Sequence, residues 1–458
     1  MHHLKTKIPA ALTCALALLL SGQALASGFY LPGHGVRPLG RAGAYVVSGE
    51  QNLNSLWHNP ANLAGMEELQ LTIDLALINL SFDFQRAPRT LDNGDIETYE
   101  KVSNEAAPKP DPQVLIGGKF FIKNMSWAFG VYAPYLSAHT FPEKGAQRYA
   151  LVDNDGSLAG FFHFALAYAL GENMRFGAGI QIVPASFKFV NVASGYTGLF
   201  GKPEDPDLDI LSEITLTSIL NFSGNMGFWV RLAEHVQAAI SVQLPVVFST
   251  DDSKMRARLP SHPAFNDAKL SGDSLAGSLE FPLVVRGGIR YVNDSFDLEL
   301  ALVYENWSAF EEIRATPNEI KVDGVPGLGS IPVGPLSIPQ NWTDTYSVRL
   351  GGDFNVAKNL ILRAGYAFDS SAVPDEYYSV FIADGNKHLL SLGGTYEMGS
   401  WSIDAGFGYY LMGDRTITNS KVRQINPTDE ENALTTVIGN GEYSQTYMAG
   451  GLGVNYTF

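Results

Sequence analysis

From Leu69 onward, apolar and polar residues alternate along the chain with a period of two. Every second residue between Leu69 and Leu77 is leucine or isoleucine, and most of the residues between them are polar. Such alternation is typical of a β-strand whose two faces meet different surroundings. The pattern recurs down to the last residue, Phe458, and predicts fourteen strands.

The connections between these strands alternate between short and long. The short ones are 123–124, 171–173, 233–235, 293–294, 358–359 and 399–400, and the long ones are 86–112, 135–157, 190–212, 250–277, 308–340, 370–386 and 412–441. Short turns at one end and long loops at the other are typical of an outer-membrane barrel with no free strand edge. We therefore predict an all-β fold, a 14-stranded antiparallel transmembrane β-barrel over residues 67–458. A large secreted or periplasmic β-protein is the alternative, but it offers no reason for sorting the loops by length.

The two faces of the predicted strands differ in polarity. One face carries almost no charge, as expected toward lipid, where a lysine or arginine at the midplane costs about 2–4 kcal/mol. The other carries charges and is expected to line a polar lumen. The chain ends on Phe458, on the lipid face. Such a terminal aromatic resembles the signal read by the barrel assembly machinery, so we expect that machinery, outer-membrane lipid and lipopolysaccharide as partners of a monomeric barrel.

The first 26 residues have the pattern of a secretory signal peptide. Two lysines precede an apolar run that is too short to span a bilayer, and an Ala-Leu-Ala cleavage site ends at residue 26. A membrane anchor is the alternative. The single cysteine, Cys14, lies in this peptide, so the mature chain is expected to have no disulfide. Without two of its 31 basic residues, the mature chain carries 29 − 47 = −18 charges, which argues against nucleic acid as a partner.

Residues 27–66 fit neither a strand nor a good helix. They contain seven glycines among forty residues, and Arg37, Arg41 and Glu50 are the only charged ones. The segment also contains many aromatic and aliphatic side chains, which is unlike a linker. A glycine-rich apolar segment without periodicity has little shape of its own and needs a cavity supplied by the rest of the chain. We predict that it forms a hatch inside the barrel.

Three sequence features carry a family resemblance. Gly28-Phe29-x-Leu31 and the stretch LGRAGA at 39–44 follow the predicted cleavage site, Asn-Pro-Ala at 59–61 lies in the hatch segment, and FGVYAPY at 129–135 lies in the third strand. Together with the strand count, they resemble the FadL/TodX family of outer-membrane transporters for hydrophobic compounds. The resemblance implies capture between extracellular loops, passage to an apolar pocket in the barrel, hatch rearrangement and sideways release into the membrane, all without energy input.

The resemblance also implies that Asn59, Pro60 and Ala61 form the hatch gate. Proline has a fixed φ and no N–H, and it biases the preceding Asn59 away from helix. These residues are therefore expected to form the turn that directs the hatch toward the first strand. An ordinary turn is the alternative, because Asn-Pro is a general turn initiator.

The implied lateral opening lies in the third strand, at Gly130, Tyr132 and Pro134. Glycine weakens a strand or marks a bend, and proline cannot donate to a ladder. A local break in strand pairing is the structural requirement for an opening in the wall. The plainer reading is that Pro134 merely ends the strand.

Four arginines lie on the polar face of the second half of the chain and are candidate partners for a ligand carboxylate. They are Arg286, Arg290, Arg349 and Arg363, and neighbouring strands carry Asp297, Glu299, Asp353 and Asp369. We favour mutual salt bridging, because ionisable groups inside barrels normally pair. If every arginine is paired, a neutral hydrocarbon is as good a substrate as a fatty acid.

Apolar residues in two long loops are candidates for an extracellular ligand groove. They are Tyr196, Leu199, Phe200, Phe265 and Leu270. Exposed apolar residues can mark a ligand groove, and self-packing of long loops is the equal alternative.

The sequence contains no HExxH, CxxC or GxSxG motif, so we expect no catalytic residue, no metal and no cofactor. His163 is alone on the polar face and has no placed nucleophile, which favours a structural role. The expected function is passive outer-membrane uptake of hydrophobic small molecules, fatty acids or hydrocarbons. A lipid-modifying enzyme and a general porin or adhesin are the alternatives.

Overall fold

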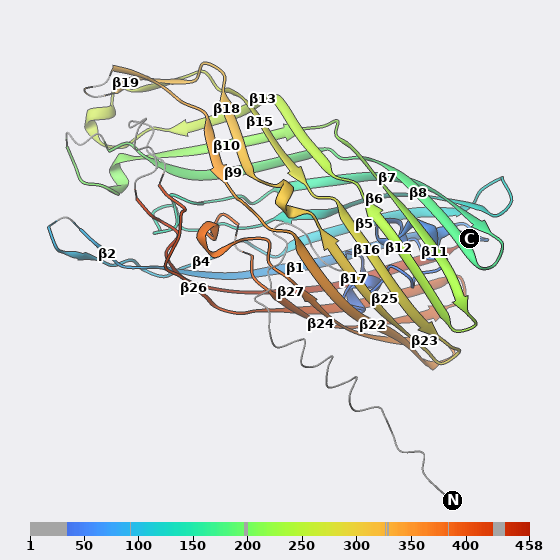
Figure 1. The fold of residues 1–458 in the computed structure, drawn as a ribbon. Coiled ribbons are helices and arrows are strands. Elements are labelled where there is room, and N and C mark those ends of the chain that lie inside the picture. Colours follow the sequence, from blue (N-terminus) through green and yellow to red (C-terminus); the bar gives the residue numbers. More distant parts are fainter. Residues whose placement is uncertain are drawn as a thin grey trace, which may run out of the picture.

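A computed structural model describes residues 34–91, 93–196, 200–325, 327, 329–382, 384–424 and 436–458. Its main feature is a closed 14-stranded antiparallel barrel (Figure 1). The first wall strand, β1 (Gln70–Arg86), pairs with the last, β27 (Gly441–Thr457), without interruption along its whole length. This pairing removes the free edges of the sheet, as a membrane requires. The predicted fold class is confirmed.

The wall strands are continuous in some places and interrupted in others. In chain order they are β1; β5 (Lys109–Lys119); β6 (Met125–Ser137); β7 (Ser157–Leu170); β8 (Met174–Ile182) with β9 (Ala185–Ser194); β10 (Asp209–Ser218) with β11 (Phe222–Ala233); β12 (Val236–Gln243) with β13 (Val246–Arg258); β15 (Ser274–Phe281) with β16 (Val284–Val292); β17 (Phe296–Glu305) with β18 (Glu312–Pro317); β21 (Leu336–Pro339) with β22 (Thr345–Ala357); β23 (Leu360–Asp369); β24 (Lys387–Met398); β25 (Trp401–Met412); and β27. β5 begins at Lys109, so the loop predicted over 86–112 was drawn too long.

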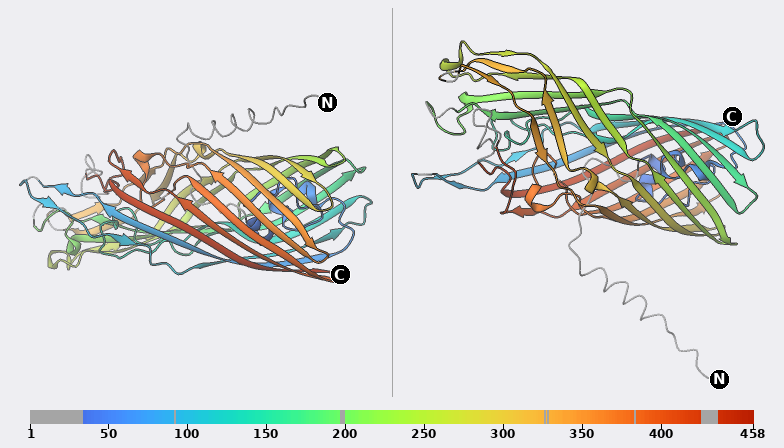
Figure 2. Two further views of the ribbon diagram at one scale, coloured as in Figure 1. Left: turned by 90° about the horizontal axis from the view of Figure 1, so that it is seen from below. Right: turned by 45° about the horizontal axis from the view of Figure 1, so that its top comes forward.

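The short turns gather at one end of the barrel, together with the C-terminus, and the long loops extend from the other end (Figures 1 and 2). The long loops add small elements outside the wall. These are β2 (Arg89–Thr90), β3 (Ile96–Glu97), β4 (Val102–Ser103), β14 (Lys269–Ser271), β19 (Lys321–Val325), β20 (Gly329–Pro332), β26 (Arg415–Ile417), η2 (Pro206–Leu208), η3 (Pro263–Phe265), η4 (Trp307–Ala309) and η5 (Asp375–Tyr377). The predicted sorting of the loops is confirmed.

The outer face of the wall is apolar and the inner face is charged. Ile73, Leu75 and Leu77 of β1 are each at least 50% exposed on the outside, whereas lumenal groups such as Asp74 and Arg349 are at most 2% exposed. This reverses the usual arrangement of a globular protein and matches a barrel whose outer surface meets lipid. Among the described residues, no helix has the length and apolar character needed to cross a bilayer.

Residues 34–66 lie inside the barrel, nearer the end with the short turns (blue in Figures 1 and 2). We call them the hatch. They contain α2 (Val36–Gly40), α3 (Ser55–His58) and η1 (Pro60–Leu63), and nearly all of them are buried. Residues 27–33 of the predicted hatch, and the predicted signal peptide, lie outside the described residues.

The hatch backbone touches the wall at glycines. A Cβ added to Gly177 of β8 would lie 2.3 Å from the carbonyl carbon of Pro60, and one added to Gly365 of β23 would lie 2.3 Å from that of Arg41. Real Cβ atoms essentially never approach other atoms this closely. Glycine in these strands therefore makes room for a second layer of backbone inside the barrel.

Candidate functional site

One wall carboxylate binds the hatch through its backbone. Glu299 of β17 accepts hydrogen bonds from three successive amides, those of Val46 (2.7 Å), Val47 (3.1 Å) and Ser48 (2.7 Å). Three convergent N–H groups form an anion-binding nest, and Glu299 is fully buried. The sequence had suggested an arginine of a neighbouring strand as partner for Glu299. Its hydrogen bonds come from hatch amides, and Arg41 of the hatch adds an ion pair at 3.9 Å.

The two arginines of the hatch pair with the wall. Arg41 donates to Asp297 at 2.7 Å and also contacts Asp353, and Arg37 donates to Asp404 at 2.7 Å. Sequence reasoning missed these pairs, although the two residues were the only basic ones in an otherwise apolar segment. They cross-link the hatch to β17, β22 and β25, so Asp297, Asp353 and Asp404 anchor the hatch.

The predicted gate residues pack against the wall. Asn59 Oδ1 accepts from the amide of Ala61 at 3.0 Å, and Asn59 Nδ2 donates to the carbonyl of Val46 at 2.9 Å. Gly227 of β11 leaves space for Asn59, because a Cβ there would meet the Asn59 side chain. The structure thus brings Asn59, Pro60 and Ala61 together in one capped turn, and their gating role stays a prediction.

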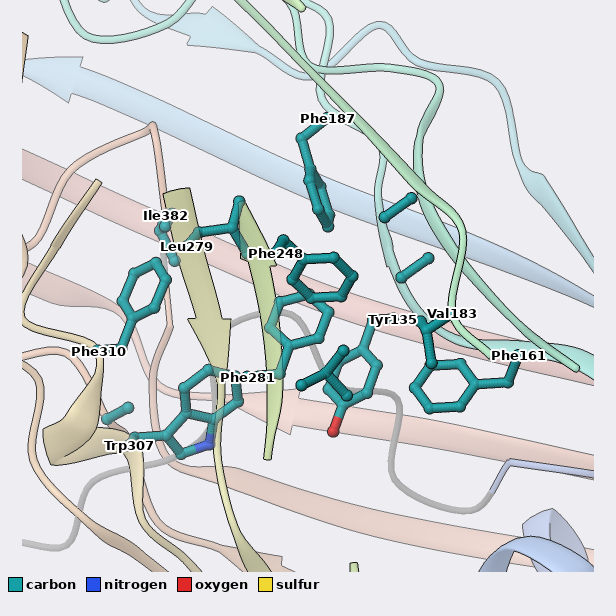
Figure 3. Close-up of a cluster of buried hydrophobic side chains, with 14 of the residues drawn as sticks. Tyr135, Phe161, Val183, Phe187, Phe248, Leu279, Phe281, Trp307, Phe310 and Ile382 are labelled. Atoms are coloured by element: carbon teal, nitrogen blue, oxygen red, sulfur yellow. The ribbon is translucent and has the colours of Figure 1, made fainter. Parts of the chain in front are cut away.

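A cluster of aromatic side chains occupies the lumen on the loop side of the hatch (Figure 3). Ring contacts run from Trp57 of the hatch to Tyr135 (6.3 Å between centroids), from Tyr135 to Phe281 (4.2 Å) and from Phe281 to Phe248 (5.0 Å). Phe187 continues the series at 5.3 Å from Phe248. We call this series the aromatic column. It is a continuous apolar surface from the upper barrel to the hatch.

Three of the four candidate arginines are paired with wall carboxylates. Arg290 donates to Asp297 (2.9 Å), Arg349 to Asp369 (3.0 Å) and Arg363 to Asp353 (3.0 Å). The favoured interpretation, mutual salt bridging, therefore holds for these three in the structure.

Arg286 differs from the other three. Its side chain is 1% exposed, yet none of its guanidinium nitrogens has a hydrogen-bond partner among the described residues. The guanidinium lies over the ring of Trp57, with Cζ 5.0 Å from the ring centroid. A cation–π contact of this kind contributes about 2 kcal/mol when desolvated, but it satisfies no N–H donor. Arg286 therefore presents unused donors at the lower end of the aromatic column.

The third wall strand, β6, loses its pairing with β5 part-way along. Their ladder runs from Lys119 opposite Ser126 to Val114 opposite Val131 and stops there. On the other side of β6, the register with β7 shifts between Tyr132 and Tyr135. We call residues 109–113 of β5 and 132–137 of β6 the β5–β6 break. The structure places Tyr132 and Pro134 inside it.

Gly130 lies just below this break, in regular pairing with Leu115 and His163. A Cβ there would lie 2.7 Å from Leu56 Cδ2 of the hatch, so Gly130 makes room for the hatch. Tyr132 faces inward and its hydroxyl lies 2.5 Å from His163 Nδ1. The sequence analysis found no partner for His163. In the structure it forms a hydrogen bond with Tyr132, which lies in the break.

Comparisons with known proteins agree with this geometry. A family model described as "Outer membrane protein transport protein (OMPP1/FadL/TodX)" matches residues 17–458. The chain belongs to this family. It is therefore an outer-membrane protein of a family that transports hydrophobic compounds.

Among relatives of this FadL/TodX-family chain, the 47 kDa outer membrane protein of Pasteurella multocida is 30% identical over 142 residues, 30% of each chain. The long-chain fatty acid transport protein of Salmonella typhi is 24% identical over 429 residues, covering 87% of this chain and 90% of that protein. A FadL homologue from Pseudomonas aeruginosa matches the fold with a TM-score of 0.75 at 15% identity, over 94% and 100% of the chains. The toluene transporter TodX of Pseudomonas putida follows at 0.65 and 14%, over 93% and 99%.

The candidate groove residues of this FadL/TodX-family chain pack mainly against one another. Phe265 is 5% exposed in a cluster with Leu208 and Val325, and Tyr196 and Phe200 pack against that cluster. Leu270 lies in β14 and is half-buried, and Leu199 lies outside the described residues. This arrangement fits self-packing of the loops; the groove stays a prediction.

A buried carboxylate joins the loops above the barrel. Glu204 accepts from both terminal nitrogens of Arg86 (2.8 and 2.9 Å) and from Arg89 (3.0 Å). Burial alone would raise the pKa of Glu204, but the two arginines outweigh it and hold that pKa below its usual value. The charged pairs therefore fasten the loop around Glu204 to the upper end of β1.

Proposed function

We propose that this chain takes up hydrophobic molecules with a terminal carboxylate, such as long-chain fatty acids, and that Arg286 binds the carboxylate. The observation that carries the proposal is the buried guanidinium of Arg286, whose nitrogens lack hydrogen-bond partners among the described residues. Buried donors that are left without an acceptor are unfavourable. A ligand carboxylate would accept two parallel hydrogen bonds from the guanidinium, a charge-assisted pair with defined geometry.

The aromatic column supports the same proposal from the side of the ligand tail. It leads from the loops to Trp57, whose ring lies directly under Arg286. A hydrocarbon tail along the column would remain in apolar contact while its carboxylate reaches the guanidinium. A long-chain fatty acid transport protein is among the relatives.

A second candidate substrate is a monoaromatic hydrocarbon. Two structural relatives are described as a toluene transporter and a monoaromatic hydrocarbon channel, and an aromatic column suits flat apolar rings. This candidate has no use for the unpaired donors of Arg286, so we favour the carboxylate.

For the exit we propose the β5–β6 break. Pairing stops there in a wall whose outer face is apolar, so a ligand that leaves sideways would enter lipid directly. Movement down a concentration gradient then needs no energy input. We further propose that the chain is a monomer without enzymatic activity, that Phe458 is its signal for the barrel assembly machinery, and that lipopolysaccharide surrounds its outer end.

The test measures equilibrium binding of oleate and of its neutral methyl ester to the purified protein. Arg286→Gln should weaken oleate binding about tenfold or more, since a hydrogen bond to a charged group contributes about 1.5–3 kcal/mol, and should leave the ester unchanged. Arg290→Gln is the matched control, because Arg290 already has a carboxylate partner. Equal binding of oleate by the wild type and Arg286→Gln would overturn the carboxylate proposal and favour the hydrocarbon.

A further inference from the structure

Strand β5 has a proline at every second position where it faces the break. Pro108 immediately precedes the strand, and Pro110 and Pro112 lie inside it. Successive N–H groups of a strand point to opposite edges, so these three residues share one edge. Proline has no N–H and is normally confined to unpaired edges of a sheet.

The shared edge is the one toward β6. The amide of Phe120, also an even-numbered residue, donates to the carbonyl of Met125 in the turn to β6 (2.8 Å). The ladders that β5 forms with β1 and with β6 show no register shift, so the parity holds along the strand. The β6-facing edge of β5 therefore has no N–H donor at Pro108, Pro110 or Pro112.

The donor-free stretch coincides with the loss of pairing. The β5–β6 ladder ends at Val114, and the next residue of β5 that faces β6 is Pro112. Continuing the register of Val114 opposite Val131 would pair Pro112 with Ala133, at the point where the register of β6 shifts between Tyr132 and Tyr135. That pair is absent, although β5 remains paired with β1 at Pro112 and Pro110.

The break lies in the apolar belt of the barrel. Pro112 and Pro110 pair directly with Leu75 and Leu77 of β1, which are 50% and 54% exposed on the outer face. In hydrocarbon, an unpaired N–H is costly because water cannot bond it. Proline removes this cost on the β5 side, so the strand edge can stay open in lipid.

The break is bounded above and below, and it is covered from inside. Below it stands the Val114–Val131 pair. Above it, Asn104 Nδ2 donates to the carbonyls of Leu80 (2.8 Å) and Ala138 (3.1 Å). Asn104 thereby links β1 to the end of β6. On the lumenal side, His34 of the hatch lies between Asp111 and Tyr132, 3.2 Å from the Asp111 carboxylate.

We infer that Pro110 and Pro112 are the positioning residues that hold the lateral exit open in the barrel wall. The inference rests on the proposed sideways release. It assigns the opening to missing donors on β5, in addition to the bend expected in β6. Restoring the donors should let the ladder extend beyond Val114 and close the wall.

The test is the double variant Pro110→Ala/Pro112→Ala in the full-length protein. We expect the new amides at 110 and 112 to be protected from hydrogen exchange like those of Val114, and oleate uptake into cells to fall about tenfold, with oleate binding unchanged. Pro245→Ala is the control, because Pro245 lies between β12 and β13 and does not face this break; it should leave uptake unchanged. The inference would be overturned if the amides at 110 and 112 exchanged rapidly in the double variant. It would also be overturned if they were protected and oleate uptake stayed normal.

A second variant separates this inference from the exit route itself. A disulfide formed in Pro112→Cys/Ala133→Cys would fasten the two edges reversibly, in a mature chain predicted to lack cysteine. Suppose that oxidation abolishes uptake, that reduction restores it, and that the alanine variant transports normally. The ligand then leaves through the β5–β6 break, but the prolines are not what holds it open. If the oxidised protein transports normally, ligand does not leave here and both fail.

Discussion

The guanidinium of Arg286 lies over the indole of Trp57, 5.0 Å from the ring centroid, and joins a wall strand to the hatch without a hydrogen bond. Trp57 also contacts Phe161 edge-on at 5.5 Å and is 2% exposed. The pair therefore connects the hatch, the aromatic column and the candidate carboxylate site. A ligand that binds Arg286 must touch the hatch as well, which offers a direct route from binding to hatch movement.

Trp57→Leu should remove both the cation–π contact and a large buried ring. We expect the free energy of unfolding to fall by about 3–5 kcal/mol, measured by urea unfolding of the refolded barrel. Trp401→Leu serves as the control, since it removes an indole that is half exposed on the surface. An equal loss from both variants would show that Trp57 has no special place in the hatch.

Glu299→Gln should loosen the hatch while leaving the wall intact. The amide keeps the size of the carboxylate but loses its charge and one of the oxygens that accept from Val46–Ser48. We expect a loss of about 2–3 kcal/mol and an increase in small-ion leak across planar bilayers. Glu397→Gln, at an exposed position, should change neither. If the barrel were destabilised but its conductance unchanged, Glu299 would stabilise only the wall and not the hatch.

Gly177→Ala should displace the hatch turn at Pro60. The added Cβ would lie 2.3 Å from the carbonyl carbon of Pro60, whereas at Gly287 its nearest neighbour would be 3.9 Å away. Overpacking of this kind costs about 1–3 kcal/mol, so Gly177→Ala should lower stability and Gly287→Ala should not. Equal stability of the two variants would indicate that the hatch yields freely at this contact.

The loops above the barrel should loosen in acid. The pKa of Glu204 is held below the ordinary value of 4.5 by Arg86 and Arg89 despite its burial. A depressed carboxyl pKa means stabilisation that is complete above about pH 4.5 and is lost as the pH falls through the lower folded-state pKa. Protease cleavage within 195–208 should therefore rise below pH 4, and Glu204→Gln should show that cleavage already at pH 7. A pH-independent cleavage rate in the wild type would contradict this.

The barrel could be predicted from the sequence for two reasons. Its strands face lipid on one side and the lumen on the other, which gives a period of two, and its loops are short at one end and long at the other. The outward leucines of β1 and the inward charges followed from that pattern. The hatch could be predicted only as a segment that needs a cavity. Its anchors could not, because Glu299 binds backbone amides of Val46–Ser48, which leave no side-chain signature.

The same limits applied to the site residues. Local pairing rules treat Pro110 and Pro112 as loop residues, and the sequence interpretation duly placed them in the loop 86–112. The structure shows them in a wall strand that is paired on one side only. Which of the four arginines is unpaired depends on the hatch and on neighbouring strands together, so no spacing in the sequence could single out Arg286.

The most direct test of the account is to find where a fatty acid lies in the purified protein. A fatty acid with a photoreactive diazirine next to its carboxylate should label the peptides that contain Trp57 and residues 284–292, and excess oleate should prevent the labelling. Arg286→Gln should lose this label. Labelling confined to the loop residues 196–208 and 262–271, unaffected by Arg286→Gln, would contradict the central claim that the lumenal arginine binds the ligand.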